Sequence, residues 1–199
     1  MSNLKTLTDD QLVALYLEGN NKAFDELLNR HKERLYSYIH FIVRSHEVAE
    51  DLFQETFVKA IVTMQQGRYN SDGKFSAWLT RIAHNLVIDR FRQERNENVI
   101  SNDESEVDLF NNSAYSEGTI ESRMVNEQVL KDVRRLVDHL PDCQREVIYM
   151  RFYQSLSFKD IATITGVSIN TALGRVRYAL INLRRIAEEK NISLVLETV

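Results

Sequence analysis

The stretch FSAWLTRIAHNLVIDRFR, residues 75–92, has the pattern of one long amphipathic helix. At about 100° per residue, its apolar side chains fall on one side and its Arg, His and Asn side chains on the other. The predicted inward side carries Phe75, Trp78, Leu79, Ile82 and Leu86, with Asp89 beside them. The predicted outward side carries Arg81, His84, Asn85 and Arg92, with Arg95 close by. Such a helix can pack on a core and still present donors to phosphates and bases, although a solvated charged face has the same pattern.

The composition around this stretch favours an all-α protein. One proline and six glycines among 199 residues leave few positions that break helices, and 43% hydrophobic residues suffice for small packed cores. Hydrophobic periodicity and capping signals predict helices over residues 8–19, 21–44, 46–66, 74–95, 120–139, 141–153, 157–165 and 168–190. Residues 68–73 are rich in Asn, Ser, Asp and Gly and are expected to form a loop.

The charge distribution predicts two small helical domains, residues 1–95 and 120–190, followed by a tail at 191–199. Between them, residues 96–119 hold six acids and no Lys or Arg, which is typical of a flexible acidic linker. The net charge of −4 becomes +2 once these six acids are set aside, so the predicted domains are mildly basic. We therefore expect two folded parts with surfaces unlike that of the linker.

Several classes of protein are disfavoured by what the sequence lacks. The single cysteine, Cys143, excludes an internal disulfide and a paired-thiol metal site. No apolar run approaches the roughly 18 residues of a membrane span, so we expect a cytoplasmic protein with no membrane insertion. The five histidines show no metal-ligand spacing or nucleophile partner, and a Gly-rich phosphate loop is missing. We expect neither an enzyme nor a bound metal or cofactor.

Residues 157–183, SFKDIATITGVSINTALGRVRYALINL, have the pattern of a helix-turn-helix. Ala162 permits close helix crossing, Gly166 suits the turn, and Ser168 can cap the second helix. The predicted core side of that helix carries Ile169, Ala172, Val176, Leu180 and Leu183. The predicted DNA-facing set is Ser168, Asn170, Thr171, Gly174, Arg175, Arg177 and Tyr178. Polar residues at the start of such a helix reach base edges, and flanking Arg side chains hold phosphates.

A third pattern is an acidic arc on the helix predicted over residues 46–66. The arc consists of Glu47, Glu50, Asp51, Gln54 and Glu55. Such a face can be merely solvated, or it can bind a basic protein, because complementary charge orients partners and speeds association.

Together, AEDLFQETFVKA (residues 49–60), FSAWLTRIAHNLVIDRFR (75–92), LPDCQREVIYMRF (140–152) and the helix-turn-helix resemble the sigma-70 family of bacterial RNA polymerase subunits. The size resembles the extracytoplasmic-function (ECF) group, which has only the region-2 and region-4 domains. The resemblance implies region 2 at residues 1–95 and region 4 at 120–190. It also implies a sigma factor that binds core RNA polymerase and directs promoter-specific initiation, in the cytoplasm and at the nucleoid when bound to polymerase.

The resemblance further implies a set of contacts. The acidic arc would bind the coiled coil of the polymerase β′ clamp, and the β flap would be a second contact on polymerase. The −10 element would be read and melted by the loop and the outward helix face, through Arg68, Tyr69, Asn70, Lys74, Arg81, His84, Asn85, Arg92 and Arg95. The −35 element would be read by the helix-turn-helix set given above. The acidic linker would thread through the RNA channel of the polymerase, and an anti-sigma factor is implied as a further partner, although no residue identifies one.

Two alternatives remain open at this point. An ordinary helix-turn-helix regulator with an unrelated helical sensor domain would explain residues 157–183 but not the 75–92 helix or the acidic arc. A helical interaction or scaffold protein would explain the acidic faces but not the outward Arg and Asn side chains. Ala172 and Gly174 stand where the sigma family commonly has Val and Ser, which leaves the −35 sequence open.

Overall fold

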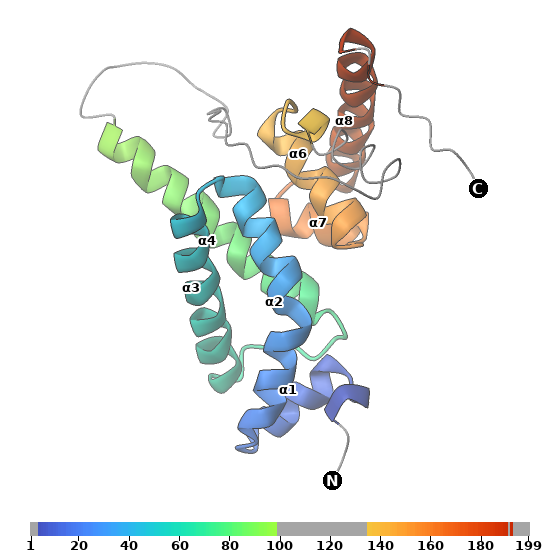
Figure 1. Cartoon of the computed structure of the whole chain (residues 1–199). Coiled ribbons are helices and arrows are strands. Elements are labelled where there is room, and N and C mark those ends of the chain that lie inside the picture. The colour runs from blue at the N-terminus through green and yellow to red at the C-terminus, as the bar shows by residue number, and fades with distance from the viewer. Residues whose placement is uncertain (1–3, 99–134, 191, 193–199) are drawn as a thin grey trace, which may run out of the picture. The chain divides into compact units, whose positions relative to one another are not determined.

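The computed structural model describes residues 4–98, 135–190 and 192, and its chain divides into two compact units, Met1–Ser105 and Glu106–Val199 (Figure 1). Every regular element within those described ranges is a helix. The predicted all-α fold is therefore confirmed. Most of the predicted linker, the 120–139 helix up to residue 134, and nearly all of the 191–199 tail lie outside the described residues.

The first unit is built from α1 (Asp9–Leu17), α2 (Asn21–Val43), α3 (His46–Gln65) and α4 (Phe75–Asn98), preceded by a short 3-10 turn at Leu4–Thr6. The three long helices pack against one another, and α1 packs mainly on α2 (Figure 1). Their shared core is apolar and fully buried. It includes Leu12, Leu27, Tyr38, Ile39, Ala49, Ala60, Met64, Phe75, Leu79, Ala83 and Val87.

Local capping explains where α1 and α3 begin. The Thr8 hydroxyl accepts from the Gln11 backbone N–H, and the Gln11 side chain accepts from the Thr8 backbone N–H at 2.9 Å. Ser45 caps α3 in the same manner by accepting from the Val48 backbone N–H. These bonds satisfy helix donors that would otherwise lack partners, and the Thr8–Gln11 pair is reciprocal. The predicted starts of α1, α2 and α3 are confirmed within one residue.

The end of α4 differs from the expectation. The helix continues to Asn98, three residues into the segment predicted as linker. An ion pair between Arg90 and Glu94, with 2.7 Å between Nε and Oε1, lies on its last three turns. Such pairs at a spacing of four residues add modest helix stability, and no proline or glycine ends the helix earlier.

The second unit contains α6 (Asp142–Ile148), which continues as a π-helical turn η2 (Tyr149–Tyr153), then α7 (Phe158–Thr165) and α8 (Ile169–Glu189). α8 packs on both α6 and α7. Ala162, Ala172 and Ala179 are almost completely buried, so the backbones of α7 and α8 can approach closely. The remaining core includes Val147, Ile148, Met150, Ile161, Ile164, Leu183 and Ile186.

The turn between α7 and α8 has the predicted chemistry. Gly166 adopts φ +68°, in the left-handed region that side chains with a Cβ rarely occupy. Ser168 then caps α8, since its hydroxyl accepts from the Thr171 backbone N–H at 3.0 Å. The predicted helix-turn-helix is confirmed.

The sequence analysis wrongly assigned two residues to the core side of α8. Ile169 is 46% exposed and Leu180 is 40% exposed. The buried arc of α8 is centred on Ala172, Ala179 and Leu183, and Ile169 and Leu180 lie at its edge. Because α6 and α7 cover only one side of α8, an apolar residue at that edge remains open to solvent.

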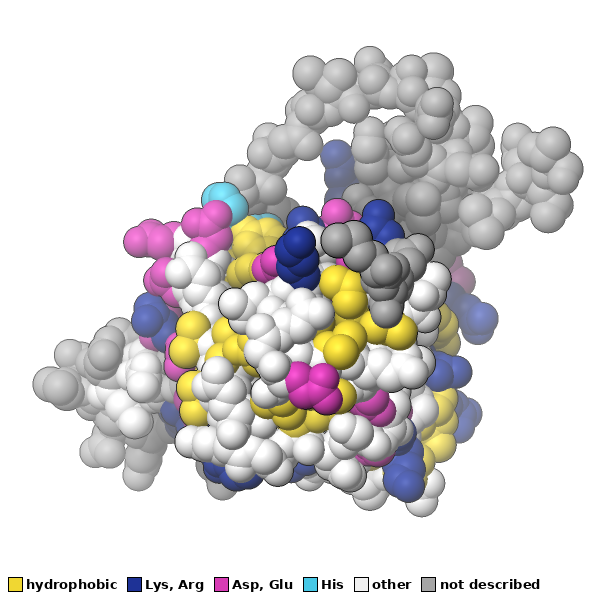
Figure 2. Space-filling view, turned by 90° about the horizontal axis from the view of Figure 1, so that it is seen from below, with side chains coloured by type: hydrophobic (Ala, Val, Ile, Leu, Met, Phe, Trp, Pro, Cys, Tyr) yellow, Lys and Arg dark blue, Asp and Glu magenta, His cyan; other side chains and the backbone are white. Residues whose placement is uncertain are grey.

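No helix in the described ranges is long and apolar enough to cross a membrane. The face seen in Figure 2 shows hydrophobic side chains in several small patches between polar ones, with Lys and Arg mainly towards its rim. Scattered patches of this size are ordinary for a protein surface.

Candidate nucleic-acid interface

The loop between α3 and α4, residues 66–74, holds four of the predicted −10 residues. Arg68, Asn70 and Lys74 are exposed, whereas Tyr69 is half-buried. The Tyr69 ring lies edge-on to Trp78, with 4.7 Å between ring centroids, and 5.8 Å from the Phe75 ring. The loop therefore rests on aromatic side chains of α4 and presents the other three predicted residues outward.

The Tyr69 hydroxyl is already engaged within the protein. It donates to Asp10 Oδ1 at 2.5 Å. Burial, together with this bond to the Asp10 carboxylate, raises the pKa of Tyr69 well above its ordinary value of 10.0. Tyr69 thus supports the loop with a neutral phenol, and its hydroxyl is committed to α1.

On α4, four of the five predicted outward residues are exposed, namely Arg81, Asn85, Arg92 and Arg95. The prediction for His84 is wrong, because this side chain is only 8% exposed. Its Nδ1 lies 3.4 Å from the Tyr38 hydroxyl of α2. The prediction that Asp89 faces inward is also wrong, since its side chain is 56% exposed and pairs with Arg92 at 3.4 Å.

Both errors on α4 have one cause. The helix packs against α2 and α3 together, so its buried arc is centred on Ala83 and Val87 instead of on Trp78 and Ile82. His84 lies on the buried side of that arc, and Asp89 lies opposite it. Phe75 is 1% exposed, as expected for a core residue, whereas Trp78 is half-buried. The small buried residues Thr80, Ala83 and Val87 were the signal that could have located this arc.

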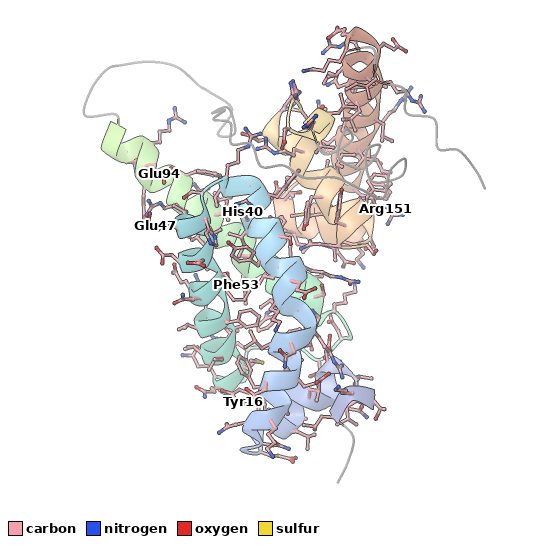
Figure 3. All side chains as sticks on the ribbon, in the orientation of Figure 1. Tyr16, His40, Glu47, Phe53, Glu94 and Arg151 are labelled. Atoms are coloured by element: carbon pink, nitrogen blue, oxygen red, sulfur yellow. The ribbon has the colours of Figure 1, made fainter. Side chains whose placement is uncertain are left out.

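The acidic arc on α3 is exposed in full. Glu47, Glu50, Asp51, Gln54 and Glu55 all face solvent, while Leu52, Thr56, Phe57, Ala60 and Met64 are buried on the opposite side. Figure 3 shows Glu47 at the start of α3, at the same end of the α2–α3 pair as His40. Phe53 packs between the two helices, with its ring 5.8 Å from that of Tyr36. The buried side of α3 thus holds the helix in place, and the charged side remains available.

The sequence analysis missed an apolar continuation of this arc. Val58 is 59% exposed and Val62 is 42% exposed, and they follow Gln54 at intervals of four residues. Four-residue spacing places all three side chains on one face of α3. The exposed face therefore changes from carboxylates in its first half to Val58 and Val62, with the exposed Lys59 beside them, in its second half.

In the second unit, the first turns of α8 expose Asn170, Thr171, Arg177 and Tyr178, the last of them 63% exposed. Gly174 and Arg175 are half-buried. The Ser168 hydroxyl caps α8 and lies 2.8 Å from the Thr171 hydroxyl, so both hydroxyls have partners within the helix. The structure thus brings the predicted −35 residues together along one exposed side of α8.

Comparison with known proteins gives these surfaces a context. Residues 27–97 match the family model for sigma-70 region 2, and residues 130–179 match the model for sigma-70 region 4. The ECF RNA polymerase sigma-E factor of Escherichia coli is 30% identical over 176 residues, which cover 85% of this chain and 89% of that protein. This chain belongs to the ECF group of the sigma-70 family. The sigma-70 resemblance seen in the sequence is confirmed.

Other relatives of this ECF sigma factor agree. SigW of Bacillus subtilis is 26% identical over 171 residues, covering 84% of this chain and 90% of that protein. Among solved structures, the sigma factor RpoE of Bartonella quintana, in complex with the anti-sigma factor NepR, matches with a TM-score of 0.63, 25% identity, and coverage of 84% and 98%. CnrH, in complex with the cytosolic domain of CnrY, matches with a TM-score of 0.62, 25% identity, and coverage of 91% and 97%.

ECF sigma factors bind core RNA polymerase and promoter DNA and direct promoter-specific transcription initiation. In this sigma factor the region-2 match includes α3, the loop and nearly all of α4, and the region-4 match includes α6, α7 and the first half of α8. Within the described ranges, no group of three or more His, Cys, Asp or Glu residues could hold a metal ion.

Proposed function

We propose that this sigma factor reads the −10 element with its first unit and the −35 element with its second. The observation that supports this assignment is that α4 and α8 each bury one face in a core and expose Asn and Arg side chains on the other. Each contact set is small, so each unit alone binds DNA weakly. Holding both on one polymerase raises their effective concentration at the promoter.

For the −10 element, the proposed contacts are the exposed residues Arg68, Asn70, Lys74, Arg81, Asn85, Arg92 and Arg95. Arg and Lys side chains neutralise phosphates, while Asn side chains reach base edges. The loop is also the proposed wall of a pocket for one base taken out of the stack. Unstacking costs a few kcal/mol, which contacts to the extruded base offset, and so the loop assists melting of the −10 element.

For the −35 element, the proposed contacts are Asn170, Thr171, Gly174, Arg175, Arg177 and Tyr178, with Ser168 at the cap of α8. A recognition helix enters the major groove with its first turns against base edges. The exposed Asn170 and Thr171 lie in the first turn, and Arg177 lies two turns further along, where a phosphate contact suits it.

For polymerase, we propose that the acidic arc on α3 binds the coiled coil of the β′ clamp and that the second unit contacts the β flap. Carboxylates steer a basic partner into position, whereas buried apolar contacts hold it. The exposed Val58 and Val62 continue the face of the acidic arc and are suited to supply such apolar contacts.

We also propose an anti-sigma protein as a partner, as seen for the Bartonella RpoE. The exposed Leu173, Leu180 and Ile181 on α8 offer an apolar surface for it. The proposed role involves no catalysis by this chain and places it in the cytoplasm, at the nucleoid when bound to polymerase.

The test is reconstitution of core RNA polymerase with the full chain on a library of genomic promoter fragments. The proposal predicts initiation that depends on the chain and on paired −10 and −35 sequences. If the folded chain binds DNA but adds no initiation, the helix-turn-helix regulator becomes the better assignment.

A further inference from the structure

Two neighbouring acids at the start of α1 bind different parts of the first unit. Asp9 binds α2, through Oδ1 to Arg30 Nη1 at 3.1 Å and Oδ2 to His31 Nε2 at 2.9 Å. Asp10 instead binds the loop between α3 and α4. One acid therefore fastens α1 to the bundle, and the other joins α1 to the loop proposed to read the −10 element.

Both carboxylate oxygens of Asp10 are used at the loop. Oδ1 accepts from the Tyr69 hydroxyl at 2.5 Å, and Oδ2 accepts from the Gly73 backbone N–H at 2.9 Å. Tyr69 lies near the start of the loop and Gly73 lies near its end. A single side chain, 59 and 63 residues away along the sequence, thus ties together the two sides of the loop.

Other features of the loop also favour this one conformation. Gly73 adopts φ +74°, which a residue with a Cβ would rarely adopt. The Tyr69 ring is held against Trp78 and Phe75. Between the two tied positions, Asn70, Ser71 and Asp72 remain exposed. The tie therefore shapes the exposed part of the loop without occupying its surface.

We propose that Asp10 is a positioning residue for promoter recognition, which holds Tyr69 and Gly73 so that Asn70 and its neighbours meet the −10 element in one conformation. This inference rests on the proposed −10 role of the loop. Asp10 touches no DNA in this scheme and acts through the loop alone.

A positioning role and a direct electrostatic role predict opposite outcomes for Asp10→Asn. A carboxylate that merely faced DNA would repel phosphates, so its neutralisation would strengthen promoter binding. A carboxylate that shapes the loop accepts two charge-assisted hydrogen bonds, and its neutralisation weakens both. The expected loss in initiation from the preferred −10 sequence is about tenfold, the effect of one such bond.

The experiment uses holoenzyme assembled from the full chain and a promoter library randomised at each −10 position. Asp10→Asn is expected to flatten base preference at the −10 element and leave preference at the −35 element unchanged. Tyr69→Phe, which keeps the ring and removes the hydroxyl, should shift the preference in the same direction. The double variant should be no worse than Asp10→Asn, because both changes remove the same bond.

Asp9→Asn is the control for stability, since it loosens α1 without touching the loop. It should lower the free energy of unfolding and leave the −10 preference unchanged. The inference is overturned if Asp9→Asn and Asp10→Asn are equally stable and flatten the base preference at the −10 element to the same extent. It is also overturned if Asp10→Asn strengthens promoter binding.

Asn70→Ala separates this inference from the proposed function. If Asn70→Ala changes the −10 preference and Asp10→Asn does not, only the positioning role fails. If neither variant changes it, the loop does not read the −10 element, and the proposed assignment of the loop fails together with the inference.

Discussion

The hydroxyl oxygen of Tyr38 lies 3.4 Å from Nδ1 of His84, and both side chains are buried where α2 meets α4. The two residues are 46 positions apart in the sequence. A buried imidazole beside a buried phenol gives each polar group a partner away from water. This contact assigns His84 to the core of the first unit and removes it from the DNA-facing set.

Replacing His84 with Ala should therefore destabilise the first unit. The change leaves a cavity and takes one polar neighbour from the Tyr38 hydroxyl, so the expected loss is about 2–4 kcal/mol of unfolding free energy. Urea denaturation of the full chain measures it. Arg81→Ala, at an exposed position on the same helix, should change stability by less than about 0.5 kcal/mol. A His84→Ala protein as stable as the parent would contradict the assignment of His84 to the core.

The stability of the first unit should fall in acid through Asp9. The hydrogen bond to His31, supported by Arg30, holds the pKa of Asp9 below its ordinary value of 3.8. A lowered pKa in the folded state means that the stabilisation is complete above pH 3.8 and is lost as pH falls through the folded value.

Asp9→Asn should accordingly be less stable than the parent near neutral pH, and the difference should shrink at pH values below 3.8. Chemical denaturation over a pH series gives both curves. Asp25→Asn, at an exposed position on α2, serves as the control and should leave the parent's pH profile intact. A constant gap between Asp9→Asn and the parent at all pH values would contradict the assignment.

Reversing charge on the acidic arc should weaken polymerase binding. Asp51→Lys combined with Glu55→Lys places like charges against a basic partner, for which we expect an affinity loss of at least about tenfold. Asp25→Lys with Glu33→Lys alters the net charge equally at exposed positions of α2 and is the matched control. Binding to core polymerase is measured by equilibrium titration. Equal losses in the two double variants would point to net charge instead of a specific contact.

Gly174 offers a test in which stability and function should move in opposite directions. A Cβ built at Gly174 meets nothing within 4 Å, and the residue lies inside α8. Gly174→Ala should thus raise the free energy of unfolding by about 0.5–1 kcal/mol through helix propensity. If the α8 backbone approaches the major groove there, initiation from −35-dependent promoters should fall. Unchanged initiation at higher stability would show that the backbone of Gly174 stays away from DNA.

Arg177 should contribute one phosphate contact. Arg177→Ala is expected to reduce the slope of log affinity against log salt by about 0.9, the value for one neutralised phosphate on duplex DNA. Holoenzyme binding to a −35 promoter at several salt concentrations gives the slope. Arg185→Ala is the control, because Arg185 pairs with Glu189 at 2.6 Å near the far end of α8. An equal change of the slope in both variants would contradict a specific phosphate contact by Arg177.

Much of the local structure could be predicted because its causes are local. Thr8, Ser157 and Ser168 cap helices through bonds to residues three positions ahead, and Gly166 turns the chain within one residue. Such signals are complete within a short stretch of sequence. The acidic arc could also be predicted locally, because its carboxylates and the buried apolar residues of α3 each recur at helical spacing within one helix.

The orientation of α4 could not be predicted in this way. Periodicity identifies an amphipathic helix, but the direction of its buried arc depends on how many neighbours cover it. Two neighbours, α2 and α3, bury His84 and leave Asp89 exposed.

The sequence by itself determined the helices, the helix-turn-helix, the acidic arc and the family, since each depends on residue order over short distances. Only the tertiary structure decided which flank of α4 remains exposed and that Asp10 holds the loop at Tyr69 and Gly73. Both depend on contacts between residues that are dozens of positions apart. Sequence patterns do not encode such contacts directly, because packing of whole helices brings the partners together.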